Sequence, residues 1–239
     1  MTVLPLLSLI AALANAQNST PTPERIFERL LPEAEVVIPG PKVEIKLVID
    51  PTGADNAHAC GPGTTCPDKT HPSLYRVVIG QKYIEACQNA DELAGILAHE
   101  IAHIRLGHSD SGSDDAAFAN WSKRMQVDHP DEFAELGNPR SFWWTTPDYA
   151  EYSRGNESAA DKYASDIVIR AGFRGEARVD FYRREAKKHP EWEASRPEAT
   201  HPASSERAEA AAQRTQALQE FLKRHPHGPW DASYEANQP

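Results

Sequence analysis

Residues Leu97–Ile104 read LAHEIAHI, and this stretch decides how the rest of the chain is interpreted. It holds the pattern H-E-x-x-H in an apolar frame, which is typical of a largely buried helix. His99 and His103 are four residues apart. Since a helix has about 3.6 residues per turn, both imidazoles lie on one face and can hold one zinc ion. Glu100 is placed to take a proton from a metal-bound water, so the stretch predicts the active-site helix of a zinc hydrolase.

The flanking residues predict where this helix begins and ends. Asn89 can cap its N-terminus, and Glu92 completes a capping-box arrangement. Gly107 is a natural stop after about Leu106. If the helix continued, His108 would point away from His99, because each residue turns the helix by about 100°. We therefore expect His108 to interact with the helix dipole and not to bind the metal.

A second pattern offers a third ligand, which a catalytic zinc site usually needs. Glu157 and Asp161 lie four residues apart on a helix predicted over residues 157–171. Glu157 can reach the metal as a carboxylate ligand, and Asp161 can accept the free ring N–H of a ligating histidine. By itself, E-x-x-x-D on a helix is usually just a solvated face. The prediction gains its specificity from the H-E-x-x-H helix.

The composition limits the class of protein. The chain has 239 residues, of which 40% are hydrophobic and 25% charged, and this is ordinary for one globular domain. Its net charge of −10, without a stripe rich in Lys or Arg, argues against a nucleic-acid partner. No segment after the N-terminal one is apolar enough for a transmembrane helix.

The N-terminus is interpreted as an export signal. Val3–Leu13 is too short to span a bilayer but suits a secretory apolar region, and Ala14–Ala16 gives a small-x-small cleavage site. We expect a signal peptide over residues 1–16 and a periplasmic or secreted mature protein. A short buried N-terminal helix is the alternative, because the segment lacks Lys and Arg.

The rest of the sequence predicts an α+β fold that is mostly helical with a small β-sheet. Alternating apolar residues predict strands over Val43–Ile49 and Leu74–Ile79. Further helices are expected over Pro23–Leu31, Tyr83–Cys87, Ala116–Val127, Glu176–Lys188 and Ser204–Arg224. Residues 56–70 are expected to be a loop, residues 129–150 a long irregular crossing, and Asn156 the start of the helix that carries Glu157.

Cys60, Cys66 and Cys87 are the cysteines of the chain. An odd number in an exported protein suggests one disulfide and one spare thiol, and Cys60 and Cys66 enclose a Gly/Pro-rich loop that could close into a bridge. His58 and His71 flank this loop, so a second metal site is conceivable, but the spacings fit no standard ligand pattern. We therefore favour a disulfide, or free thiols without a function, over a second metal site.

Several of these motifs together resemble a known family. Ala98–His103 and Asn156–Asp161 resemble the corresponding motifs of the gluzincin metallopeptidases, which include the CAAX prenyl endopeptidase and the HtpX heat-shock protease. Residues 56–61 are similar to the family's N-A-F-A-x-P-G-G segment, and residues 200–207 to its T-H-P…S-E-R motif. The resemblance covers roughly residues 40–215. The family's membrane-embedded members have several transmembrane helices, so this chain is more similar to the soluble exported ones.

The resemblance implies a zincin-like fold and one zinc ion held by His99, His103 and Glu157. Glu100 would be the catalytic base, and Asp161 would orient a ligating histidine. His201 would lie near the cleft as an occasional extra ligand, transition-state donor or switch residue.

The composition along the chain and the resemblance together predict an organisation and an activity. Residues 17–40 would form a lead-in with a short helix, residues 41–224 the zinc metallopeptidase domain, and residues 225–239 a flexible tail. The expected activity is endopeptidase cleavage of exported or misfolded proteins, with the substrate strand lying beside Leu74–Ile79. A catalytically weak metal-binding or chaperone-like domain of the same fold is the alternative, although an intact Glu100 argues against it. The third possibility is a zinc hydrolase that acts on a substrate other than a peptide.

Overall fold

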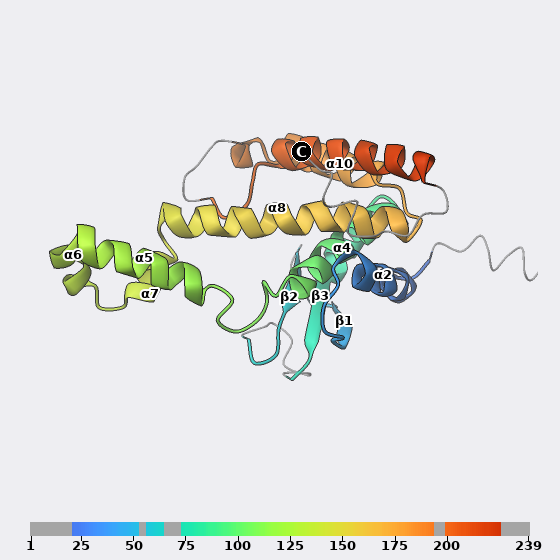
Figure 1. Ribbon diagram of the computed structural model, residues 1–239. Coiled ribbons are helices and arrows are strands. Elements are labelled where there is room, and N and C mark those ends of the chain that lie inside the picture. Colours follow the sequence, from blue (N-terminus) through green and yellow to red (C-terminus); the bar gives the residue numbers. More distant parts are fainter. Residues whose placement is uncertain (1–20, 53–55, 65–72, 194–198, 226–239) are drawn as a thin grey trace, which may run out of the picture.

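The computed structural model of the chain describes residues 21–52, 56–64, 73–193 and 199–225. It has the predicted α+β fold, with a layer of helices on one side and a small sheet on the other (Figure 1). The expected signal peptide and nearly all of the expected tail lie outside the described residues. Within the described part, no helix is both long and apolar enough to cross a membrane.

The sheet has three strands in the order β1-β3-β2. Two of them, β1 (Ile45–Asp50) and β3 (Tyr75–Gly80), are close to the predicted ranges and run parallel. The third, β2 (Ala57–Cys60), pairs antiparallel with β3 and falls where a loop was expected. That expectation was wrong because β2 has only four residues and a Gly/Pro-rich segment follows it.

This strand order corrects the expected position of the substrate. The central strand β3 is paired with β1 along one edge and with β2 along the other. Its backbone N–H and C=O groups are therefore already used, and no further strand can add beside it. The free edge next to the helices belongs to β2.

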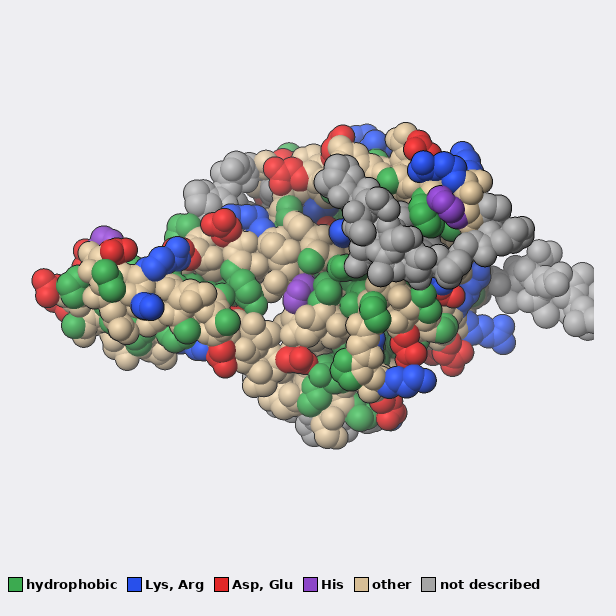
Figure 2. Space-filling view, viewed as in Figure 1, with side chains coloured by type: hydrophobic (Ala, Val, Ile, Leu, Met, Phe, Trp, Pro, Cys, Tyr) green, Lys and Arg blue, Asp and Glu red, His purple; other side chains and the backbone are tan. Residues whose placement is uncertain are grey.

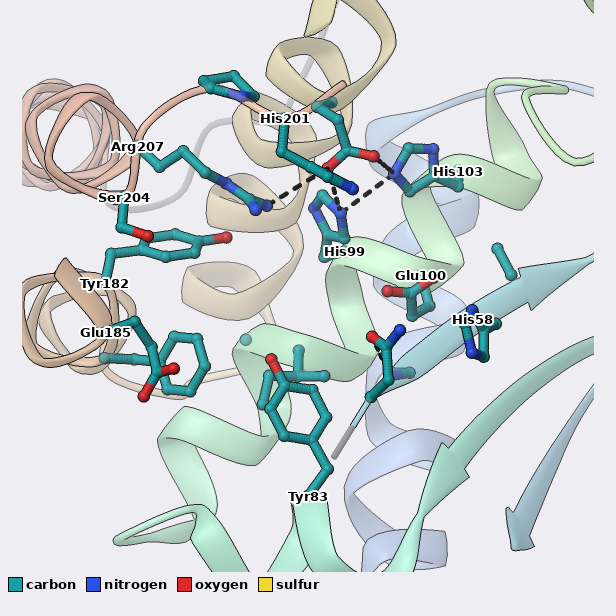
Figure 3. A pocket seen from close by; sticks show the side chains of 18 of the residues that line it. His58, Tyr83, His99, Glu100, His103, Tyr182, Glu185, His201, Ser204 and Arg207 are labelled. Atoms are coloured by element: carbon teal, nitrogen blue, oxygen red, sulfur yellow. Dashed lines mark hydrogen bonds and ion pairs between the residues drawn. The ribbon is translucent and has the colours of Figure 1, made fainter. Parts of the chain in front are cut away.

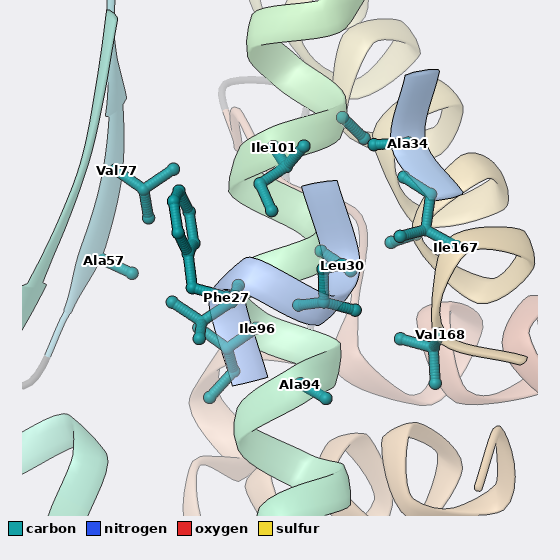
Figure 4. Packing of buried hydrophobic residues seen from close by; sticks show 14 of the residues in the cluster. Phe27, Leu30, Ala34, Ala57, Val77, Ala94, Ile96, Ile101, Ile167 and Val168 are labelled. Atoms are coloured by element: carbon teal, nitrogen blue, oxygen red, sulfur yellow. The ribbon is translucent and has the colours of Figure 1, made fainter. Parts of the chain in front are cut away.

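The core forms around the helix α4 (Ala90–Arg105), which packs against α2 (Pro23–Val37) and α8 (Pro147–Arg170). Figure 4 shows α2 between the sheet and α8, with Phe27 on the sheet side and Leu30 on the side of α8. The helix α2 begins at Pro23 as predicted, with the Thr22 side chain accepting a hydrogen bond from a backbone N–H in the first turn. It continues past the predicted end, so a longer apolar face is buried against α4.

The other helices complete the helical layer and an arm. Two of them, α9 (Glu176–Lys188) and α10 (Ser204–Arg224), have the predicted bounds, and α10 lies along α8 and α9 (Figure 1). The arm extends to the left in Figure 1. Its elements are α5 (Asp115–Asp128), α6 (Pro130–Glu135) and α7 (Pro139–Trp143). Two short elements, α3 (Gln81–Ala86) and the 3₁₀ helix η1 (Pro190–Trp192), connect the larger ones.

The irregular crossing expected over residues 129–150 is in fact largely helical. Pro130, Pro139 and Pro147 each occupy the first turn of a helix, a position where a missing N–H costs nothing. Thr146 caps α8 by accepting a hydrogen bond from a backbone N–H in the first turn. The helix α8 therefore begins at Pro147, and Asn156 lies inside it instead of opening it.

Candidate metal centre

The helix α4 begins and ends where the sequence predicts. The Asn89 side chain accepts a hydrogen bond from the Glu92 N–H at 3.0 Å. At the other end, Leu106 is the C-cap and Gly107 has a φ of +75°, a left-handed conformation that ends the helix. The residues between are mostly buried, and His99 and Glu100 are only 8% and 9% exposed. The core thus fixes the backbone that carries both side chains.

Packing of α8 against α4 brings Glu157 to His99 and His103, the two histidines that lie side by side in Figure 3. His99 Nε2 and His103 Nε2 are 3.1 Å apart. Glu157 Oε2 lies 3.2 Å from His99 Nε2, and Glu157 Oε1 lies 3.2 Å from His103 Nε2. The structure therefore brings together the three side chains that were predicted as ligands from two separate motifs.

The chemistry of this group fits a zinc ion. Ligand atoms at the corners of a zinc tetrahedron with bonds of about 2.0–2.1 Å lie about 3.3 Å apart, close to the distances found here. Burial by itself would raise the pKa of Glu157, but hydrogen bonds from His103, His201 and His99 hold it far below its usual value. The group thus offers two imidazole nitrogens and an ionised carboxylate. Among the His, Cys, Asp and Glu side chains of the described residues, these three lie close enough together to share one metal ion.

The three side chains face a cleft of about 850 Å³ between the helical layer and β2. In Figure 2 the surface is hollowed at the centre of this face, and a histidine side chain is visible there. Glu100 lines the cleft between His99 and the strand that carries His58 (Figure 3). Tyr83 forms part of the wall farther from the predicted ligands (Figure 3), and Phe181 also lines the cleft.

Asp161 contacts more groups than the sequence predicts. Its Oδ1 lies 2.9 Å from His99 Nδ1, which is the predicted contact. It also accepts hydrogen bonds from Arg207 at 2.6 and 2.8 Å, from Arg178 at 2.8 Å and from the Tyr182 hydroxyl at 2.8 Å. Burial alone would raise its pKa, but Arg207 and His99 hold that pKa well below its usual value. Asp161 is thus an ionised acceptor shared by His99, a predicted metal ligand, and two arginines.

Sequence reasoning missed the roles of Arg178 and Tyr182, and it noted Arg207 only as part of the S-E-R motif. Arg178 and Tyr182 are four residues apart on α9, and both are buried. A buried arginine needs an acidic partner, so Arg178 on the apolar face of α9 was a usable signal. Nothing in the sequence indicates that the partner is Asp161.

His108 is also closer to the site than expected. The helix does not continue through Gly107, and the His108 N–H donates to the His103 carbonyl at 2.9 Å. The ring then lies beside that of His103, with the two Nδ1 atoms 3.0 Å apart. Burial and the neighbouring His103 lower the pKa of His108 to about 4, so its imidazole is neutral at pH 7. The expectation that His108 points away from the site was wrong, because it extended the helix past a left-handed glycine.

His201 and the cysteines complete the comparison with the predicted residues. His201 Nδ1 lies 3.1 Å from Glu157 Oε2, and the side chain is 63% exposed, so the T-H-P segment does reach the site. Its role stays a prediction. Cys60 is disulfide-bonded and Cys87 is free. Cys66 and His71 lie outside the described residues.

Comparison with known proteins agrees with this geometry. Residues 18–215 match the sequence model of peptidase family M48. A search among curated proteins gave no match. The family match covers α4, α8 and the first half of α10, and these helices carry the predicted ligands and Arg207. The chain therefore belongs to peptidase family M48, a family of zinc-dependent metallopeptidases.

Proposed function

We propose that this protein is a zinc metalloendopeptidase that cleaves exported or misfolded polypeptides. One observation carries the proposal. Glu100 lines the same cleft as the three converging ligand side chains, and the free edge of β2 forms the opposite wall. A base, a metal site and a strand edge for a peptide are thus combined in one cleft.

The protein's own residues divide the catalytic work. Zinc held by His99, His103 and Glu157 would supply Lewis-acid polarisation of the scissile carbonyl and make water more acidic. Glu100 accepts the proton of the attacking water and donates it to the leaving amine. His201 is exposed at the mouth of the site, where its ring can donate a hydrogen bond to the developing oxyanion.

The edge of β2 is suited to bind an extended peptide. The Gly80 N–H donates to the Asn56 carbonyl at 3.0 Å, so the backbone of Asn56 faces β3. Because backbone direction alternates along an antiparallel strand, the N–H and C=O groups of Ala57 and Ala59 face the opposite way. The Asn56 side chain accepts a hydrogen bond from the Ala57 N–H at 2.8 Å and so occupies the donor that a substrate would use. An incoming peptide replaces this contact and pairs with β2.

The location and the closer relationship are part of the same proposal. The apolar segment before Ala14–Ala16 supports export to the periplasm or outside the cell. The disulfide at Cys60 supports an oxidising compartment. Together with the motifs, these features favour the soluble exported type of protease related to the CAAX prenyl endopeptidase and HtpX.

The test compares the wild type with Glu100→Gln, and uses Glu35→Gln on the exposed face of α2 as the matched control. Casein and a peptide blocked at both ends are the substrates, and zinc content is measured on the same samples. We expect Glu100→Gln to keep its zinc and to lose about 10²–10⁴-fold in turnover, the usual contribution of a general base. Wild-type activity should disappear with a chelator and return with zinc.

Two results would overturn the proposal. Full turnover by Glu100→Gln would remove the role given to Glu100. A zinc-loaded wild type that cleaves neither substrate would favour the catalytically weak, chaperone-like alternative. Cleavage of the doubly blocked peptide separates an endopeptidase from an enzyme that needs a free terminus.

A further inference from the structure

We propose that His108 is a positioning residue for the metal ligand His103, and that the β-sheet holds His108 in place through the loop after α4. This inference rests on the proposed function in one respect, which is that zinc binds at His99, His103 and Glu157. It adds a residue that neither the H-E-x-x-H pattern nor the Glu157 motif contains.

The direction of the hydrogen bond follows from the metal site. His103 faces His99 and Glu157 with Nε2, so Nε2 must offer its lone pair and the ring proton must sit on Nδ1. The group 3.0 Å from that Nδ1 is His108 Nδ1. His108 therefore accepts through Nδ1 and keeps its own proton on Nε2. A ligating histidine usually donates its other ring N–H to an acceptor in this way, and a neutral imidazole fills that role here.

The backbone around His108 is fixed from both sides. On the helix side, Gly107 turns the chain and the His108 N–H is bound to the His103 carbonyl. On the sheet side, the Tyr75 hydroxyl at the start of β3 donates to Asp110 at 2.7 Å. Gly61, just after β2, lies so close to Ser109 that a Cβ added to Gly61 would be 2.1 Å from the Ser109 carbonyl oxygen. The ends of two strands thus contact the residues that follow His108.

The first measurement is the zinc affinity of the full chain, by competition with a chromophoric chelator. His108→Leu removes the acceptor, whereas His108→Asn places an amide oxygen near the position of Nδ1. We expect zinc affinity to fall about 10–100-fold in His108→Leu and to stay close to wild type in His108→Asn. His58→Leu, in the same cleft, is the matched control and should keep wild-type zinc affinity. Circular dichroism of each metal-free variant confirms folding.

The second measurement is nuclear magnetic resonance of the zinc-loaded protein with ¹⁵N-labelled histidine. The wild type should show a slowly exchanging proton on His103 Nδ1, and this signal should be lost in His108→Leu and kept in His108→Asn. A role in packing alone would leave the two variants alike. The inference is overturned if the wild type lacks the protected proton, if His108→Leu binds zinc like the wild type, or if His108→Asn is as weak as His108→Leu. Neither measurement uses a substrate. A failure of this inference can therefore be distinguished from a failure of the proposed peptidase activity.

Discussion

His99 and His103 of α4 are held in place by different kinds of interaction, and these come from opposite sides of the helix. We call α8, α9 and α10 the helical side, and β2, β3 and the loop of residues 106–114 the sheet side. On the helical side, His99 contacts the ionised Asp161, which also binds two buried arginines. On the sheet side, His103 contacts the neutral His108. One predicted ligand is therefore oriented by a buried charge network, and the other by a single neutral acceptor on a loop.

The two sides differ in how strongly the contacts of the site contribute to folding free energy. Charges in the interior are stable only while each has its partner, so the helical side cannot lose Asp161 without a large loss in folding free energy. The contacts of the sheet side are neutral or solvent-exposed, and removing one costs much less. We therefore expect the sheet side to tune the zinc affinity and the helical side to determine stability as well.

The largest effect is expected for Asp161→Ala. Removing this carboxylate takes away the charged acceptor that the buried Arg178 and Arg207 share, and the loss of one partner from such a site costs about 3–5 kcal/mol. Urea unfolding of the metal-free protein measures that loss, and chelator competition should show weakened zinc binding.

Asp166→Ala is the matched control for this variant. Asp166 is a second buried carboxylate on α8, and it binds Arg214 at 2.7 Å on another part of the helix. This variant should lose stability and keep its zinc affinity. The charged support of His99 would be contradicted if Asp161→Ala changed zinc affinity no more than Asp166→Ala.

A smaller effect is expected for Gly61→Ala. The added Cβ would collide with the Ser109 carbonyl, so the loop that carries His108 must move, and such overpacking typically costs about 1–3 kcal/mol. Zinc affinity should fall with it. Gly137→Ala, where the added methyl group meets nothing within 4 Å, is the control. Wild-type zinc affinity in Gly61→Ala would show that the sheet does not act on His103.

The smallest effect is expected for Tyr75→Phe. It removes the hydrogen bond to Asp110 and leaves the ring in place. Because that bond is exposed, the loss in folding free energy should lie at the low end of about 0.5–1.5 kcal/mol. Thermal unfolding measures it. A larger loss than in Gly61→Ala would reverse the order of importance assigned to the two contacts.

Local rules were enough to predict the three side chains that converge as candidate metal ligands. His99, Glu100 and His103 follow from helical spacing inside one element, and the side-chain pair on α8 follows from the same spacing in another. That these elements would meet came from the chemistry of zinc, which needs a third ligand. The α+β fold and the bounds of α9 and α10 were predictable for the same reason, since amphipathic periodicity is a local property.

The features that were missed depend on contacts distant in sequence or on short segments. The strand β2 has four residues and forms by pairing with β3, so its own residues give little signal. The prolines of the arm were interpreted as loop residues although they begin helices. The network at Asp161 joins α8, α9 and α10, and no spacing within one helix reveals it. His108 was misplaced because a left-handed Gly107 changes the direction of the chain.

The most direct test of the metal site is X-ray absorption at the zinc edge of the zinc-loaded wild type. With ligands from His99, His103 and Glu157, the spectrum should show imidazole nitrogens and a carboxylate oxygen at about 2.0–2.2 Å and no sulfur. Mutation of Glu157 to Ala should remove the carboxylate contribution and leave both imidazoles. A sulfur neighbour at about 2.3 Å, or a spectrum without imidazole, would contradict the account.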